Sequence, residues 1–390
     1  MTKAKSKSTK LVFVAVVFVI IVGGVWVGYT FLLQPFLEVP LQYVAVGQEM
    51  MVEIEKDVVS HKLTPASVRA VYMTSWVAGT PSIRERLIKL IEATELNAVV
   101  IDIKDYSGRI AFATTDPELV ATGAVEVRIP AVKELISDLH RRGVYVIGRV
   151  SVFQDVYYAN QHPEFAVHRS SDGEVWRDRK GISWLEVGAT PVWAYVVRIA
   201  RAAYDVGFDE INFDYIRFPS DGDMRDIGYD YFDAASETRA AVLKRFYAYL
   251  AAELSPLHIP ISADLFGLTT TSFDDLGIGQ VLVDVAPYFD YLSPMVYPSH
   301  FASGFLNFPN PANHPYEVVN HSMLSASGRL TAASSTPDKL RPWLQDFNLG
   351  ASYTAEMVRA QIQATYDAGL DSWMLWDPNN RYTPAALNGL

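Results

Sequence analysis

The side chains best suited to chemistry are acids that follow short apolar runs. Asp102, Asp214 and Asp264 each come at or near the end of a segment rich in Val, Ile, Phe or Ala. Cleavage of a glycosidic bond needs two carboxyl groups, because one protonates the leaving oxygen while the other attacks the anomeric carbon or activates water. We therefore take Asp214 as the candidate nucleophile or base and Asp264 as the candidate acid, and Asp102 as a substitute for either.

The elements that must position these acids alternate along the chain. From residue 68 onward, apolar runs of strand length are separated by amphipathic stretches of helix length, a pattern typical of repeated βα units. The expected strands are 68–74, 98–103, 144–150, 210–215, 259–265, 291–297, 341–347 and 372–376. The expected helices are 81–93, 131–142, 191–205, 234–254 and 354–368.

Eight strands alternating with helices predict an α/β fold, a (β/α)8 TIM-type barrel over residues 68–390. A doubly wound open sheet is the alternative, but no Gly-x-Gly-x-x-Gly or P-loop pattern follows the first strand to favour it. A barrel places its reactive groups at the carboxyl ends of its strands, where these acids fall.

Alternation of side chains along a strand predicts which groups face the barrel interior. It places Glu210, Asn212 and Asp214 on one face, opposite residues 211 and 213, and it places Asp102 and Lys104 together. A buried acid needs a partner, and Arg149 and Lys104 are the expected ones. Polar and aromatic side chains near the strand ends are the candidates for binding a sugar: Lys104, Arg149, Asn212, Arg217, Tyr297, Trp376, Asp377 and Trp184.

Other kinds of active site fit the sequence less well. The chain has no cysteine, no His-Glu-x-x-His and no Gly-x-Ser-x-Gly, so thiol, zinc and serine hydrolase motifs are missing. The acids of residues 221–226 lack the spacing of a calcium loop. We expect no metal ion and no cofactor.

The amino-terminal segment predicts a membrane anchor. Residues 11–33 carry no charge and are long enough to span a bilayer, and four lysines precede them. The positive-inside rule then places residues 1–10 in the cytoplasm and the rest outside, with residues 34–67 as a stalk. A cleaved signal peptide is the alternative, but its apolar region would be shorter and would end in a small-residue cleavage site.

The charge of the chain bears on its partners. Acids outnumber bases, 44 to 33, and nucleic-acid binding requires clustered Lys and Arg. We expect a polysaccharide or oligosaccharide partner, a membrane contact through residues 11–33, and no nucleic acid.

Several long motifs resemble one bacterial family. They are Val100-Ile-Asp-Ile-Lys-Asp105, Trp176-Arg-Asp-Arg-Lys-Gly181, Phe208-Asp-Glu-Ile-Asn-Phe-Asp-Tyr-Ile-Arg-Phe-Pro219, Leu292-Ser-Pro-Met-Val-Tyr-Pro-Ser299, Arg341-Pro-Trp-Leu-Gln-Asp346 and Trp373-Met-Leu-Trp-Asp377. In this order they are similar to the glycoside-hydrolase-like TIM-barrel domain family, whose function is uncharacterised. The resemblance runs from about residue 68 to the end and implies a glycoside-hydrolase-like barrel in an exported or envelope-associated protein.

Two departures from the family pattern bear on this expectation. Trp184-Leu-Glu186 stands where a Trp-Leu-Asp-Pro-like turn is expected, and eight residues follow Tyr382, too few for a full last helix. The first departure bears on whether the expected loop contact forms, and the second bears on whether the barrel closes. The expected function is cleavage of an envelope or extracellular polysaccharide, and the alternative is a catalytically inactive, glycan-binding barrel that serves as an anchored scaffold.

Overall fold

Eight parallel strands close into a barrel in the computed structural model, which describes residues 59–388. Each strand pairs with the next along the chain, and β8 pairs with β1. The strands are β1 (Arg69–Met73), β2 (Ala98–Lys104), β3 (Tyr145–Ser151), β4 (Glu210–Asp214), β5 (Ile261–Phe266), β6 (Tyr291–Met295), β7 (Trp343–Gln345) and β8 (Trp373–Trp376). The predicted TIM-type barrel and its eight strands are confirmed, and the open sheet is excluded.

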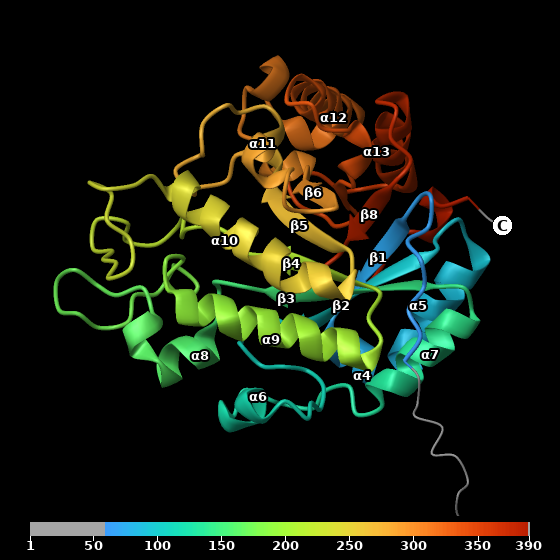
Figure 1. Cartoon of the computed structure of the whole chain (residues 1–390). Coiled ribbons are helices and arrows are strands. Elements are labelled where there is room, and N and C mark those ends of the chain that lie inside the picture. The colour runs from blue at the N-terminus through green and yellow to red at the C-terminus, as the bar shows by residue number, and fades with distance from the viewer. Residues whose placement is uncertain (1–58, 389–390) are drawn as a thin grey trace, which may run out of the picture. The chain divides into compact units, whose positions relative to one another are not determined.

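Helices follow the strands and cover the outside of the barrel. They are α4 (Ser75–Gly79), α5 (Pro81–Ala93), α6 (Pro117–Ala121), α7 (Val132–Arg141), α8 (Val156–Gln161), α9 (Thr190–Val206), α10 (Arg239–Leu254), α11 (Leu282–Val285), α12 (Pro315–Ala332) and α13 (Ala355–Asp367). Helices α9 and α10 lie side by side, as do α12 and α13 (Figure 1). The five predicted helices are present, whereas α12 was not expected.

Local sequence signals set where these helices begin and end. Thr238 caps α10 by accepting a hydrogen bond from the amide of Ala241 (3.1 Å). Helix α9 ends at Gly207, whose φ of 111° lies in the left-handed region that favours glycine. The end of α9 at Gly207 lets the chain turn toward the start of β4.

The barrel closes although no α-helix follows β8 within the described residues. Instead, the segment after β8 folds back onto β1: the Tyr382 hydroxyl donates to the Tyr72 carbonyl (2.5 Å), and Asn380 Nδ2 donates to the same oxygen (3.3 Å). These bonds occupy the junction between the last and first strands. The barrel is therefore closed, although the segment after β8 is too short for a full last helix.

The inside of the barrel at the amino-terminal end of the strands holds a buried ion pair. Arg341 Nη1 donates to both carboxylate oxygens of Glu210 (2.9 and 3.0 Å). The hydroxyl of Ser262 also donates to Glu210 (2.6 Å). Glu210 thus faces inward, as alternation predicts for the polar residues of this strand, while Ile211 and Phe213 pack in the main hydrophobic core.

The chain that precedes β1 packs against this same end. The amide of Lys62 donates to Asp209 (2.6 Å), and the Thr64 hydroxyl is hydrogen-bonded to that of Tyr145 (3.0 Å). The predicted stalk of residues 34–67 therefore contacts the barrel over its last residues, and its earlier part lies outside the described residues. The predicted membrane segment, residues 11–33, also lies outside them, and from residue 59 to residue 388 no helix has the length and apolarity that crossing a bilayer requires.

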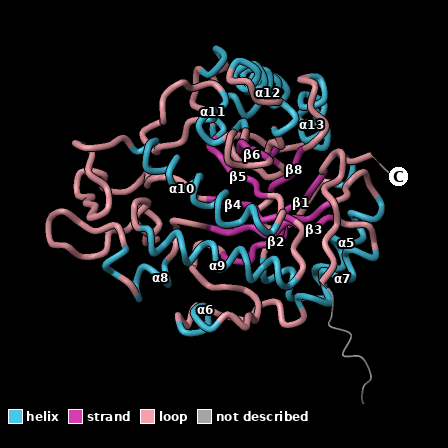
Figure 2. The backbone as a smooth tube through the Cα atoms, in the orientation of Figure 1, coloured by secondary structure: helices cyan, strands magenta, loops and turns pink. Residues whose placement is uncertain are grey.

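Long loops emerge at the opposite end, where the strands have their carboxyl termini. Residues 162–189 follow α8 and residues 215–238 follow β4, and both loops extend on the left in Figure 2. They lie against each other, because the amide of His168 donates to the Gly228 carbonyl (3.2 Å) and Ser171 bonds to Asp226 (2.8 Å). These two loops build up one side of the barrel mouth.

Candidate active site

A cavity of about 560 Å³ opens at the carboxyl ends of the strands. Six consecutive strands, β3 to β8, each contribute a side chain to its wall. The lining residues are Arg149, Lys180, Asp214, Tyr215, Arg217, Asp264, Phe266, Gly267, Leu268, Met295, Tyr297, His300, Phe301, Trp343, Phe347, Trp376 and Pro378. The cavity wall is therefore mainly aromatic or apolar, with two acids and a few bases, a composition common in sites that bind small organic groups.

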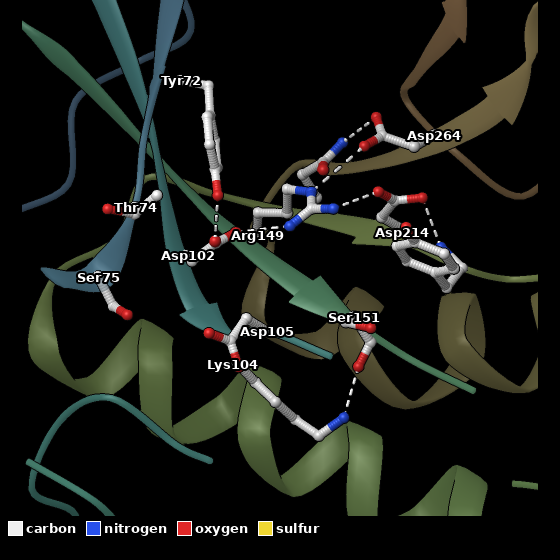
Figure 3. Close-up of polar contacts among 12 residues, drawn as sticks. Tyr72, Thr74, Ser75, Asp102, Lys104, Asp105, Arg149, Ser151, Asp214 and Asp264 are labelled. Carbon is white, nitrogen blue, oxygen red and sulfur yellow. Dashed lines mark hydrogen bonds and ion pairs between the residues drawn. The ribbon is translucent and has the colours of Figure 1, made fainter. Parts of the chain in front are cut away.

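Arg149 joins all three predicted acids at the base of this cavity (Figure 3). Its Nη1 donates to Asp102 (2.6 Å) and its Nη2 to Asp214, while its Nε lies 3.8 Å from Oδ2 of Asp264. All four side chains are buried. One guanidinium therefore holds carboxylates from β2, β4 and β5 in a single cluster, as the strand-end pattern predicts.

Asp214 is held from two sides. Its Oδ2 is paired with Arg149, and its Oδ1 accepts a hydrogen bond from the amide of the next residue, Tyr215 (2.5 Å). Tyr215 has a φ of 54°, a left-handed conformation that is uncommon for an aromatic residue. Strain of this kind concentrates at functional sites. Here it accompanies the hydrogen bond from the Tyr215 amide that fixes the Asp214 carboxylate at the cavity wall.

Asp264 has a different environment. Its Oδ1 accepts hydrogen bonds from Asn212 Nδ2 (2.9 Å) and Trp343 Nε1 (2.8 Å), whereas Oδ2 accepts none from the residues that the structure describes. Burial raises the pKa of Asp264 well above its ordinary value, and the negative charge of Asp214 raises it further. The site therefore favours a neutral acid at Asp264 beside an ion-paired carboxylate at Asp214.

Asp102 lies behind Arg149 and is absent from the cavity wall. The Tyr72 hydroxyl donates to Asp102, and the Tyr72 ring stacks on Trp376 with ring centroids 3.9 Å apart. Burial raises the pKa of Asp102, although Arg149 and the Tyr72 hydrogen bond oppose this. Asp102 can orient Arg149, but this position does not suit the reactive role that the sequence left open for it.

The prediction that Lys104 shares a face with Asp102 is wrong. The pairing of β2 with β3 shifts by one residue between these positions, so Lys104 aligns with Val150 instead of continuing the inward face. Lys104 points away from the Arg149 cluster (Figure 3), pairs with Asp155 (2.7 Å) and donates to the Ser151 carbonyl (2.5 Å). It is fully buried and does not line the cavity.

The remaining predicted binding residues divide into two groups. Arg149, Arg217, Tyr297 and Trp376 line the cavity. Asn212 lies beneath Asp264, and Asp377 turns toward the backbone after β8, where it accepts from the Asn379 amide (2.5 Å). Trp184 is fully buried and donates to Asp178 (3.1 Å), so it supports the wall without forming its surface.

Several lining residues were not predicted. Phe266 is the last residue of β5, and Phe301, Phe347, Lys180 and His300 come from the loops that follow the strands. Their positions depend on how those loops fold back, which alternation along a strand does not specify. The long loop before α9 was a weak signal, because its length and its polar and aromatic content are typical of a functional loop.

One group of side chains in the described part of the chain has metal-binding geometry. Donor atoms of His168, Glu186 and Asp230 lie within 4.8 Å of one another. However, both oxygens of Glu186 already accept backbone hydrogen bonds, from the amides of Asp230 and Tyr231 (2.7 Å each). None of these three residues lines the cavity, so the group is separate from the cluster of Asp214, Asp264 and Arg149.

Solved structures with the same fold include known glycoside hydrolases. The PgaB (BpsB) glycoside hydrolase domain from Bordetella bronchiseptica is 14% identical, with a TM-score of 0.60 over 83% of this chain and 99% of that one. An α-galactosidase from Thermus thermophilus in complex with stachyose is 15% identical, with a TM-score of 0.50 over 84% of this chain and 65% of that one. At such identities the likeness shows the barrel fold alone.

A closer sequence relative is a hypothetical protein from Ruminiclostridium thermocellum. It is 30% identical over 53% of this chain and 98% of its own length, with a TM-score of 0.46. No curated protein matches the chain. Residues 70–382 match a family model that covers nearly the whole barrel, and the chain therefore belongs to the family described as "Putative glycosyl hydrolase domain".

Proposed function

We propose that this protein hydrolyses glycosidic bonds in an envelope or extracellular polysaccharide, with Asp264 as the general acid and Asp214 as the nucleophile or base. The observation that carries the proposal is the contrast between these two acids in one cavity. Asp214 is ion-paired with Arg149, while Asp264 is buried and has a raised pKa. One carboxylate with a direct counter-ion beside one buried acid with a raised pKa is an arrangement that suits base and acid roles.

The proposed reaction uses both groups on one sugar position. The Asp264 carboxyl group gives its proton to the glycosidic oxygen as the bond from that oxygen to the anomeric carbon breaks. Asp214 either attacks the anomeric carbon, forming an ester that water then hydrolyses while Asp264 takes a proton from that water, or itself removes a proton from an attacking water. Oδ2 of Asp264 is the oxygen available to carry the proton, because Oδ1 already accepts two hydrogen bonds.

Aromatic side chains of the cavity support a saccharide as the substrate. Tyr297, Trp376 and Phe266 line the same space as the two acids. Aromatic rings offer flat apolar faces to the C–H groups of a sugar ring, and a few polar groups then fix its orientation. The family description as a glycosyl hydrolase domain supports the same class of substrate.

One observation favours the alternative of a catalytically inactive, glycan-binding scaffold. Arg149 contacts Asp214 directly, and a carboxylate that is neutralised by an ion pair is a weaker nucleophile. Against this, Asp264 has no hydrogen bond to Arg149 and both acids line an open cavity. The two functions differ in a single observable property, which is turnover of a bound glycan.

The experiment that tests hydrolysis is release of reducing ends from a panel of purified envelope and extracellular polysaccharides by the full-length chain. Asp214→Asn and Asp264→Asn keep the size of each side chain and remove its acid–base function. Asp371→Asn is the matched control, because Asp371 is exposed and precedes β8 at the other end of the barrel. Turnover by the wild type and the control that both site variants lose would support the proposal, whereas equal turnover by all four would contradict it.

We further propose that residues 11–33 anchor the protein in the cell membrane, with the barrel outside. The support is the uncharged segment itself and the four lysines before it. Protease added to intact cells or spheroplasts should then degrade the barrel, and carbonate extraction should leave the chain in the membrane fraction. A chain that is protected from protease in intact spheroplasts, or that is released by carbonate, would contradict the anchor and its orientation.

A further inference from the structure

Arg217 is a cation at the cavity wall that no acid of the described chain neutralises directly. It follows β4, is 7% exposed, and has no carboxylate oxygen within ion-pairing distance among residues 59–388. Burial lowers its pKa, and the more distant carboxylates of Asp214, Asp221 and Asp178 only partly oppose this. A buried charge without a partner is costly. Arg217 differs in this respect from Arg149, because three acids surround Arg149.

The surroundings of Arg217 hold it in place without using all of its hydrogen-bond donors. Its guanidinium lies over the rings of Phe266 (4.6 Å) and Trp184 (4.8 Å). Nη1 donates to the Phe218 carbonyl (3.0 Å) and the Ser220 hydroxyl (3.1 Å). Within the described chain Nε and Nη2 make no hydrogen bond, and both keep some solvent-accessible surface in a residue that lines the cavity.

Lys180 is, with Arg217, a second cation of the cavity wall that has no ion pair among the described residues. Its side chain is exposed, lines the cavity and forms no ion pair with the described residues. It comes from the loop before α9, yet it is close enough to His300, which follows β6, to lower the pKa of that histidine in addition to the effect of burial. Lys180 therefore faces the same space as Arg217 from another part of the mouth.

The charges of the cavity differ in sign from those of the whole protein. Three cations, Arg149, Lys180 and Arg217, line it with two acids, Asp214 and Asp264, of which Asp264 favours its neutral form. The whole chain carries a net charge of −11. A positive cavity in an acidic protein attracts anionic ligands and raises their local concentration.

We propose that Arg217, assisted by Lys180, binds an oxyanion on the sugar substrate, a carboxylate or a phosphate, so that the preferred glycan is acidic. The proposal rests on the proposed function for the placement of the sugar, but the binding it describes does not require turnover. A guanidinium with two free N–H groups matches the two oxygens of a carboxylate or phosphate. The rings of Phe266 and Trp184 hold the guanidinium ready for this contact.

The test is calorimetric binding of paired probes to the full-length chain. Oligogalacturonides, hyaluronan fragments and alginate fragments are compared with their carboxyl-reduced counterparts, and phosphorylated maltooligosaccharides with their dephosphorylated ones. We expect the acidic member of at least one pair to bind about tenfold or more tightly than its neutral counterpart, as one charge-assisted contact provides. The class of pair that shows the preference identifies the oxyanion as a carboxylate or a phosphate.

Variants separate Arg217 from the other charges. Arg217→Gln should reduce the preference to about onefold, and Lys180→Gln, at an exposed position that does not risk the fold, should reduce it by a smaller factor. Arg141→Gln is the control, because Arg141 is exposed on α7 and distant from the cavity wall. Thermal unfolding of each variant shows whether it is folded.

Each outcome decides the proposal. It is overturned if neutral and acidic members bind equally, if no acidic member binds, or if folded Arg217→Gln and Lys180→Gln both keep the full preference. Turnover of neutral glycans without any effect of Arg217 would overturn this inference and leave the proposed hydrolysis intact. Tight binding of an acidic glycan that is never cleaved would support this inference and contradict hydrolysis.

Discussion

Nε of Arg149 lies 3.8 Å from Oδ2 of Asp264, beyond hydrogen-bonding distance. The same guanidinium contacts Asp102 and Asp214 directly. Arg149 therefore stabilises negative charge on two acids and leaves the third without a direct bond. This asymmetry is the physical basis for the different roles proposed for Asp214 and Asp264.

The first prediction concerns the pH dependence of hydrolysis. Because burial raises the pKa of Asp264, its acid form persists to a higher pH than an ordinary aspartic acid. The rate should be present below that pKa and should be lost as the pH rises through it. We expect Asp264→Asn to lower kcat by about 10²- to 10⁴-fold and to remove this alkaline loss. Profiles of kcat/KM against pH check this, and an unchanged alkaline limb in the variant would rule out Asp264 as the acid.

The second prediction concerns Arg149 as the centre of the buried cluster. Arg149→Met leaves Asp102 and Asp214 without their counter-ion, and loss of one partner of a buried ion pair typically costs about 3–5 kcal/mol. We expect a fall of that size in the free energy of unfolding, measured by urea denaturation. Arg141→Gln, on the exposed surface of α7, should change it by less than about 0.5 kcal/mol. Equal stability of the two variants would show that the cluster does not depend on Arg149.

The third prediction separates a structural lysine from a binding one. Lys104 is fully buried and paired with Asp155 outside the cavity. Lys104→Met should therefore lower the free energy of unfolding by about 3–5 kcal/mol, while the folded variant keeps the KM of the proposed hydrolysis. Steady-state kinetics below the unfolding transition provide the check. A tenfold rise in KM for the folded variant would restore the substrate-binding role that the sequence suggested.

The fourth prediction concerns Glu186, which links the loop before α9 to the loop after β4. Burial raises its pKa to about 7, against the effect of the backbone hydrogen bonds from Asp230 and Tyr231. A folded-state pKa above the unfolded value of 4.5 means that the folded state holds the proton more strongly. The resulting stability is fully present below the unfolded pKa and is lost as the pH rises through the folded one.

The measurement is the difference in unfolding temperature between the wild type and Glu186→Gln, followed from about pH 4 to pH 8. We expect the wild type to lose stability relative to the variant as the pH approaches 7. His168 and Asp230 lie beside Glu186, so Asp230→Asn is included to separate the effect of that nearby charge. A difference that does not change with pH would contradict the raised pKa.

The fold was largely predictable because barrel strands leave a strong signal. Most residues of the strands are buried, which gives short segments rich in apolar side chains, and Pro or Gly marks many of the helix ends. Helix α12 was missed because Ser, Asn, His and Gly interrupt the apolar positions of residues 315–332. Packing against α13 stabilises a helix there that the local pattern does not indicate.

The site was predictable where it lies on regular strands. Asp214 and Asp264 reach the cavity and Arg149 joins them, because alternation along β3, β4 and β5 is regular. Lys104 was misplaced because a register shift at the end of β2 reverses the face. Lys180 and His300 were missed because long loops carry them, and the path of a loop depends on tertiary contacts that come from distant residues.

The roles of Asp214 and Asp264 can be separated by the dependence of the rate on the leaving group. Once the cleaved sugar is known, its 2,4-dinitrophenyl glycoside, whose leaving group needs no proton, is compared with its natural linkage. We expect Asp264→Asn to keep most of its kcat/KM on the activated glycoside and to lose kcat/KM on the natural linkage, while Asp214→Asn loses both. The assigned roles would be contradicted if Asp264→Asn lost its kcat/KM on both substrates, or if Asp214→Asn kept its kcat/KM on either one.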